Sequence, residues 1–126
     1  MDISDFQKIN QLRARRWHND GQTNWTLLEW AGAMCGESGE AANYAKKIRR
    51  LDQSLPNKEK GLTKSNYNEL RMRCAMEVAD SIIYGLILLS ELDTDASVVL
   101  RHVFNEKSIE YGFPERAPND ERGEDE

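Results

Sequence analysis

The segment from Val78 to Leu89 constrains the fold of this 126-residue chain more than any other part. Apolar residues fall on nearly every side of the helix that it would form, among them Ile82, Ile83 and Leu86. A helix that is apolar all round is stable in water only when other helices surround it, within one chain or between copies. The segment therefore predicts a central helix, or a helix that lies in an oligomer interface.

The rest of the chain also shows helical periodicity, and it has no strand-like alternation of any length. Each of four expected helices begins with a residue that can cap a helix N-terminus: Ser4, Thr26, Asn66, and either Thr94 or Asp95. The second helix is expected to reach about Arg50 and the third about Leu92, while Gly112 and Pro114 end the fourth. These signals predict an all-α fold like a four-helix bundle, with two long central helices.

Two of the helices carry apolar stripes that we expect to face the core. In the first helix the stripe consists of Phe6, Ile9, Leu12 and Arg16 or Trp17. In the second helix it consists of Leu27, Trp30, Met34, Glu37, Ala41, Tyr44 and Ile48. Glu37 therefore occupies a position where the helical period calls for an apolar side chain.

Length and charge predict one domain over residues 1–114 and a disordered acidic tail over 115–126. The last ten residues hold five acids and one arginine, so most of the formal net charge of -5 belongs to them. The chain shows no basic footprint for nucleic acid, no membrane-spanning run and no signal peptide. We therefore expect a cytoplasmic protein in which Cys35 and Cys74 are reduced and buried.

Two pairs of carboxylates, each three residues apart, lie within the two longest expected helices. Glu37 and Glu40 form the first pair, and Glu77 and Asp80 form the second. Residues i and i+3 share one face of a helix, so packing of these faces gathers four anionic groups. Like charges at short range repel one another or force protonation unless cations neutralise them. Because only oxygen ligands are present, the pattern predicts a site for Mg²⁺, with Mn²⁺ as the alternative ion.

Acidic residues at this spacing more often form a solvent-exposed helix face. The alternative to a metal site is therefore that the two acid pairs lie on the protein surface and bind no ion. Two features favour the metal site. Glu37 interrupts an apolar stripe and the second pair opens into the most apolar segment, where unpaired carboxylates are costly. Gly36 and Gly39 flank Glu37, although each helix-interior glycine costs about 1 kcal/mol relative to alanine. They suggest that a partner helix or a ligand approaches the backbone there.

The di-iron carboxylate bundle is a rival use of such acids, and it normally requires Glu-x-x-His on two helices. The chain has only His18 and His102, and neither follows a glutamate by three residues. The rival site is therefore disfavoured.

The sequence around the acids resembles the MazG-like nucleoside triphosphate pyrophosphohydrolases, within the all-α NTP pyrophosphatase group. The resemblance is carried by Gly36-Glu37-Ser38-Gly39-Glu40, by Glu77-Val78-Ala79-Asp80 with Tyr84 after it, and by Phe104–Ser108. It covers about residues 4–114. The interval Leu51–Ser65 is longer than is usual in the family, and Glu110 and Tyr111 stand where some relatives have basic or amide groups.

The resemblance implies hydrolysis of a (d)NTP to the monophosphate and pyrophosphate, by a homodimer or homotetramer that controls or cleans the nucleotide pool. It implies a Mg²⁺ site with four catalytic and metal-binding acids: Glu37, Glu40, Glu77 and Asp80. Among these we favour Glu40 as the general base. The candidates for substrate binding are Trp17, His18, Asn24 and Trp25 for the base, and Lys46, Lys47, Asn105 and Lys107 for the phosphates. Core packing of each tryptophan and solvation of each lysine remain the structural alternatives.

Two other functions stay open at this point. The same chemistry could act on another substrate of the superfamily, such as phosphoribosyl-ATP. A non-catalytic helical adaptor could also retain the fold and bind a protein partner. The presence of all four acids argues against the adaptor, because an adaptor has no need for desolvated charges.

Overall fold

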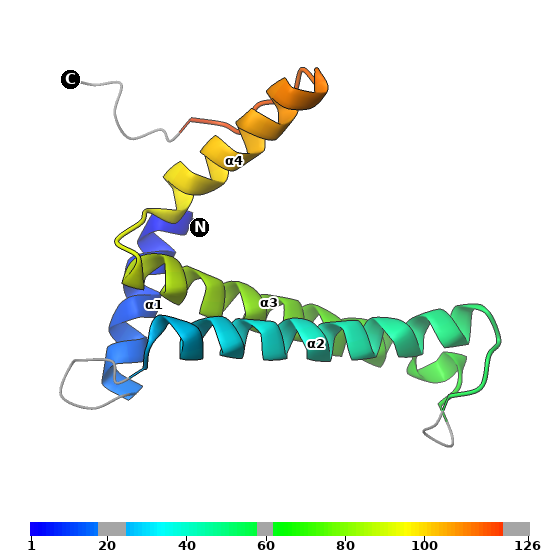
Figure 1. The fold of residues 1–126 in the computed structure, drawn as a ribbon. Coiled ribbons are helices and arrows are strands. Elements are labelled where there is room, and N and C mark those ends of the chain that lie inside the picture. Colours follow the sequence, from blue (N-terminus) through cyan, green and yellow to red (C-terminus); the bar gives the residue numbers. More distant parts are fainter. Residues whose placement is uncertain (18–24, 58–61, 120–126) are drawn as a thin grey trace. The chain divides into compact units, whose positions relative to one another are not determined.

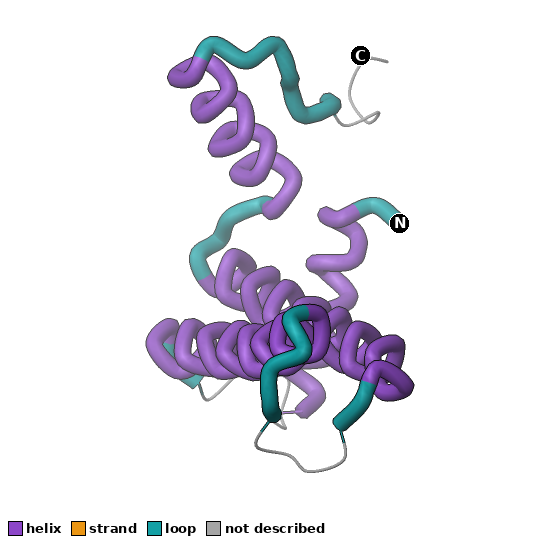
Figure 2. The backbone as a smooth tube through the Cα atoms, turned by 90° about the vertical axis from the view of Figure 1, so that its right-hand side faces the viewer, coloured by secondary structure: helices purple, strands orange, loops and turns teal. Residues whose placement is uncertain are grey.

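The computed structural model describes residues 1–17, 25–57 and 62–119. These residues form four α-helices and one short 3-10 helix, and they contain no strand (Figure 2). The elements are α1 (Ile3–Trp17), α2 (Leu27–Asp52), η1 (Lys64–Asn66), α3 (Tyr67–Glu91) and α4 (Ala96–Tyr111), as labelled in Figure 1. The all-α prediction is confirmed. Within the described ranges, no helix combines the length and apolar character needed to cross a membrane.

The chain divides into two compact units. One unit is continuous, runs from Trp25 to Gly85, and contains α2, η1 and most of α3. The other unit combines Met1–Asn24 with Leu86–Glu126, so it contains α1, the end of α3 and α4. Of the predicted acidic tail, residues 115–119 have no regular secondary structure and residues 120–126 lie outside the described ranges.

Helix α2 begins where the sequence predicts. The Thr26 hydroxyl accepts a hydrogen bond from the backbone N–H of Glu29 at 3.3 Å. The Glu29 carboxylate accepts one in return from the backbone N–H of Thr26 at 2.6 Å. This capping box satisfies two N–H groups that the helix itself leaves unpaired.

The ends of α4 are also as predicted, whereas the predicted start of α3 is used differently. Asp95 caps α4 by accepting from the backbone N–H groups of Ser97 and Val98, and Gly112 ends the helix in the left-handed conformation at φ 71°. Asn66 directly precedes α3, but its side chain accepts from the backbone N–H of Thr63 at 3.0 Å. It therefore stabilises the preceding 3-10 turn instead of capping α3.

The prediction for α1 was wrong about both its start and its buried face. The helix begins at Ile3, and Asp2 accepts from the backbone N–H of Asp5, so Ser4 is not the cap. The apolar stripe is largely exposed, at 63% for Ile9, 57% for Leu12 and 77% for Trp17. The buried face is mostly polar and consists of Ser4, Gln7, Asn10 and Ala14.

Hydrogen bonds to the connection between α3 and α4 explain this reversal. The Gln7 side chain donates to the Thr94 carbonyl at 2.8 Å and accepts from the Ala96 N–H at 2.8 Å. The Ser4 hydroxyl donates to the Asp95 carboxylate at 2.8 Å. Buried backbone groups at this turn need partners, and two polar side chains of α1 supply them.

Helices α2 and α3 form an antiparallel hairpin and lie side by side in Figures 1 and 2. The rings of Trp30 and Tyr84 lie 6.1 Å apart near one end, and Trp30 is only 2% exposed. Small residues allow close approach of the two helices further along. A Cβ added at Gly85 would lie 3.1 Å from the sulfur of Met34, and the Cys74 thiol lies 3.4 Å from the Ala41 carbonyl.

The other faces of the hairpin are less covered than the sequence predicts. Met72, Met76 and Ile82 of α3 are each more than half exposed. Side chains added at Gly36 and Gly39 of α2 would meet open space, so packing within the described part of the chain does not explain these glycines. Covering of these faces by a second copy therefore remains a prediction.

The cysteine prediction was partly wrong. Both thiols are free, but Cys35 is exposed and Cys74 is half-buried.

Candidate metal centre

Three of the four predicted acids converge across the hairpin. Glu37 extends from α2, while Glu77 and Asp80 extend from successive turns of α3. One carboxylate oxygen from each lies within 4.8 Å of the other two. Glu37 and Glu77 are half-buried and Asp80 is exposed, so the cluster opens to solvent on one side. The prediction that the two long helices bring their acidic faces together is met for these three residues.

The close approach of the three acids affects the pKa of Glu77. Its pKa is raised above the ordinary value of 4.5, first by a hydrogen bond with the Glu37 carboxyl. Desolvation raises this pKa further, as do the negative charges of Glu37 and Asp80. All of these causes act in the same direction, so the charged form of Glu77 is disfavoured beside the other two carboxylates.

The donor set fits a hard divalent cation. Three carboxylate oxygens can hold one Mg²⁺ or Mn²⁺, and both ions commonly keep further positions for water or phosphate oxygens. The ligand atoms of the cluster are all carboxylate oxygens, which are the atoms that ions of this class prefer. Glu37, Glu77 and Asp80 are therefore the residues that would hold it.

Glu40 differs from the other three acids. It lies one turn after Glu37 on α2, is exposed, and is not among the side chains gathered within 4.8 Å. The structure therefore separates Glu40 from the predicted four-residue ligand set.

Two serines at the cluster were missed by the sequence reasoning. Ser38 follows Glu37 and Ser81 follows Asp80, and their hydroxyl oxygens lie 2.7 Å apart across the hairpin. The signal was present in the sequence, because Ser38 lies inside the first acidic motif and Ser81 directly follows the second. Ser38 is exposed and Ser81 is half-buried, so the bond between them lies at the edge of the contact between the two helices.

The predicted base-binding residues fall in different parts of the chain. Trp25 is 39% exposed, and its ring lies 4.6 Å from that of Trp30, in the same unit as the cluster. Trp17 belongs to the other unit and is exposed at the end of α1. His18 and Asn24 lie outside the described residues.

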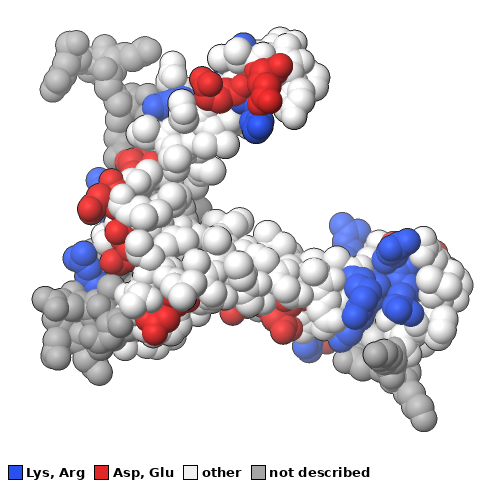
Figure 3. Space-filling model, viewed as in Figure 1, with Lys and Arg blue, Asp and Glu red and all other residues white. Residues whose placement is uncertain are grey.

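The predicted phosphate-binding lysines of α2 share a unit with the cluster. Lys46 is exposed, and Lys47 is half-buried with its ammonium group 5.4 Å from the centre of the Tyr44 ring. Figure 3 shows Lys and Arg side chains gathered at the end of the hairpin where α2 ends and α3 begins. At about 1.5 Å per residue, Lys46 lies about 14 Å beyond Glu37 along the helix axis.

The two candidates on α4 make local contacts in their own unit. The Asn105 side chain accepts from the backbone N–H of Ala117 at 2.8 Å and so ties the segment after α4 to that helix. Lys107 donates to Glu110 at 2.9 Å and lies over the Tyr111 ring. These contacts give both side chains a structural role within their own unit. Substrate binding by Asn105 and Lys107 stays a prediction.

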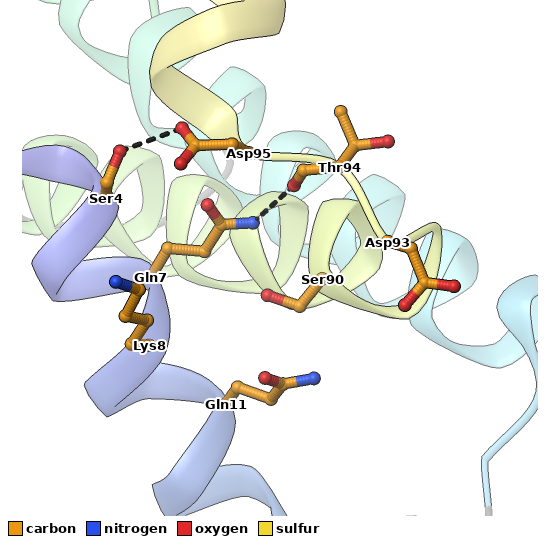
Figure 4. A pocket seen from close by; sticks show the side chains of 8 residues that line it. All are labelled: Ser4, Gln7, Lys8, Gln11, Ser90, Asp93, Thr94 and Asp95. Carbon is orange, nitrogen blue, oxygen red and sulfur yellow. Dashed lines mark hydrogen bonds between the residues drawn. The ribbon is translucent and has the colours of Figure 1, made fainter.

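A polar pocket lies between α1, the end of α3 and the connection to α4 (Figure 4). Its wall includes Ser4, Gln7, Thr94 and Asp95, which bond to one another as described above. The pKa of Asp95 is lowered, first by the Ser4 hydroxyl and then by the backbone N–H groups of α4 and the charge of Lys8, against the opposing effect of desolvation. These polar groups satisfy each other, so the pocket wall is explained as structural support for the start of α4.

Comparison of the chain with protein-family models, with curated proteins and with solved structures found no match in any of the three. The resemblance to the MazG-like enzymes therefore rests on the motifs, and the geometry of the acidic cluster is an independent observation beside them.

Proposed function

We propose that this protein is a Mg²⁺-dependent nucleoside triphosphate pyrophosphohydrolase, which converts a (d)NTP to the (d)NMP and pyrophosphate in nucleotide-pool control. The observation that carries the proposal is the convergence of Glu37, Glu77 and Asp80 from two facing helices. The same three residues belong to the two motifs that resemble the family. Geometry and sequence pattern thus support the same chemistry from different directions.

Each acid has a defined part in this proposal. Glu37, Glu77 and Asp80 would hold Mg²⁺, which offsets negative charge on the phosphate oxygens and on the pyrophosphate leaving group. Glu40 lies outside this group on the same face of α2, so its carboxylate remains available as a base. It accepts a proton from the water that attacks the α-phosphorus, while the bond to the pyrophosphate oxygen breaks.

The order of side chains along the hairpin suits a nucleotide. Aromatic rings of Trp25, Trp30 and Tyr84 cluster before the acids, and Lys46 and Lys47 follow the acids along α2. Trp30 precedes Glu37 by two helical turns, or about 10 Å. We propose that the base stacks near Trp25 and that the terminal phosphates extend toward the lysines.

Release of pyrophosphate is the direct test. Normal and damaged dNTPs are incubated with the purified protein and Mg²⁺, and the monophosphate and pyrophosphate are both quantified. A Glu77→Ala variant, shown by circular dichroism to be folded, is expected to lose the activity, and chelation of the metal is expected to abolish it in the wild type. Absence of monophosphate from every substrate in the panel would refute the proposal.

The proposal includes a homodimer or homotetramer. The uncovered apolar side chains of α3, such as Met72 and Met76, are the observation that favours it. Sedimentation equilibrium measures the mass directly, and a strictly monomeric protein at micromolar concentration would contradict this part.

A further inference from the structure

The two serines beside the acidic cluster form a small hydrogen-bond network between α2 and α3. The Ser38 hydroxyl donates to the Met34 carbonyl of its own helix at 3.0 Å. The Ser81 hydroxyl lies 2.7 Å from that of Ser38 and 3.4 Å from the same carbonyl. The Met34 carbonyl and the hydroxyls of Ser38 and Ser81 thus connect α2 and α3 at one position along the hairpin.

This position along the hairpin is also that of the acidic cluster. Ser38 directly follows Glu37, and Ser81 directly follows Asp80 and lies one turn after Glu77. The neighbouring contacts between the two helices are of a different kind. The contact of Met34 with Gly85 is steric, and that of Cys74 with the Ala41 carbonyl involves a weak thiol donor.

Directional bonds control helix rotation better than the packing of small residues does. A hydrogen bond weakens steeply as its angle departs from linearity, whereas a smooth contact between small side chains tolerates sliding. A rotation of about 20° moves a side-chain end that lies about 5–6 Å from the helix axis by about 2 Å. A shift of that size is as large as a Mg²⁺–oxygen distance, and Mg²⁺ demands near-ideal octahedral geometry.

We propose that Ser38 and Ser81 are positioning residues, which form a latch that sets Glu37 of α2 against Glu77 and Asp80 of α3 for binding of a divalent cation. The inference rests on the proposed function, because it assigns these three acids to a metal ion. It adds two residues that contact neither the metal nor the substrate and act through the helices that carry the ligands.

The test measures metal binding by metal-free protein, apart from any activity. Mn²⁺ is titrated into each variant, and the free ion is quantified by electron paramagnetic resonance. Ser38→Ala and Ser81→Ala are each expected to weaken Mn²⁺ binding about tenfold, which is the lower end of the effect seen for groups that support metal ligands. The loss of affinity in the double variant is expected to be smaller than the product of the two single losses, because the bond between the two hydroxyls is lost in either single variant.

Two further variants separate positioning from general loss of structure. Ser90→Ala is the matched control, since the Ser90 hydroxyl donates to the Leu86 carbonyl within its own helix. It is expected to bind Mn²⁺ as the wild type does. Ser81→Thr retains the hydroxyl and is expected to restore most of the affinity that Ser81→Ala loses.

The outcomes distinguish the latch from the function on which it rests. Wild-type affinity in both single alanine variants, or a double variant whose loss is the product of the single losses, would overturn the latch alone. A wild-type protein that binds no Mn²⁺ would refute the metal centre and the latch together. A wild-type protein that binds Mn²⁺ but releases no pyrophosphate would refute the enzyme, while the alanine variants would still decide on the latch.

Discussion

Glu77→Gln is expected to change metal-free stability and metal affinity in opposite directions. Because the pKa of Glu77 is raised above 4.5, the folded state binds a proton there more readily than the unfolded state does between pH 4.5 and the raised pKa. Stability associated with this group is complete below pH 4.5 and is lost as the pH rises through the raised pKa. Glutamine carries no charge at any pH, so the metal-free variant should be more stable than the wild type at pH 8 and similar to it near pH 4.

The effect on metal affinity follows from the ligand count. Glu77 supplies one of the three oxygens that lie within 4.8 Å of one another. Loss of a group that merely supports a ligand costs about 10–100-fold in metal affinity, so loss of a charged ligand should cost at least about 100-fold. At a Mg²⁺ concentration of about 100 times the wild-type Kd, binding stabilises the wild type by about 2.7 kcal/mol. The variant at the same concentration gains only about 0.4 kcal/mol.

Thermal unfolding converts these energies into a measurable difference. For a domain of this size, 1 kcal/mol corresponds to about 4 °C in Tm. Mg²⁺ should therefore raise the Tm of the wild type by about 10 °C and that of Glu77→Gln by about 2 °C. Glu106→Gln removes an exposed carboxylate of α4 and serves as the control, which should respond to Mg²⁺ as the wild type does. A Glu77→Gln variant that is less stable than the wild type at pH 8 without metal, or that keeps the full response to Mg²⁺, would refute the reasoning.

Three further predictions concern the fold around the site. Gln7→Leu removes both hydrogen bonds to the α3–α4 connection and leaves the buried Ala96 N–H and the part-buried Thr94 carbonyl without these partners, so urea denaturation should show a loss of about 2–4 kcal/mol; a loss below 1 kcal/mol would contradict this role. Asp95→Ala should cost about 1 kcal/mol at pH 7 as a lost helix cap. Because the pKa of Asp95 is lowered from 3.8, its contribution is present above that pH and fades as the pH falls through the lowered value, so wild type and variant should converge in acid unfolding. A thiol reagent should modify exposed Cys35 quickly and half-buried Cys74 more slowly, and a Cys35→Ser variant that still reacts quickly would disprove the assignment.

The candidate site could largely be predicted from the sequence because it depends on short-range periodicity. Glu77 and Asp80 share a helix face at a spacing that any α-helix enforces, and Glu37 interrupts an apolar stripe that must face another helix. The stripe of α2 has one facing partner in the hairpin, α3, which places these carboxylates together. Glu40 shows the limit of the argument. Residues three apart share a face only approximately, and the side chain one turn further lies outside the group of three.

The burial of α1 could not be predicted in this way. The spacing of its apolar residues correctly predicts a helix. The face that is buried, however, is set by Gln7 and Ser4, whose hydrogen-bond partners lie 87 to 91 residues away in the chain. A pattern rule assigns the apolar stripe to the core, since it cannot see which distant backbone groups will need donors and acceptors. The exposed stripe of Ile9 and Leu12 is thus a consequence of long-range hydrogen bonding.

The clustered acids and the exposed apolar face of α3 have one property in common: neither is stabilised by contacts within the hairpin. The hairpin brings three carboxylates together at an electrostatic cost that is visible at Glu77, and it leaves Met72 and Met76 exposed. Neither feature stabilises the hairpin as an isolated unit. In the proposed function, a divalent cation at the acids would stabilise the folded state by mass action, as would a second copy over the apolar face. A chain selected only for the stability of its isolated fold would have no reason to retain both features on the same two helices.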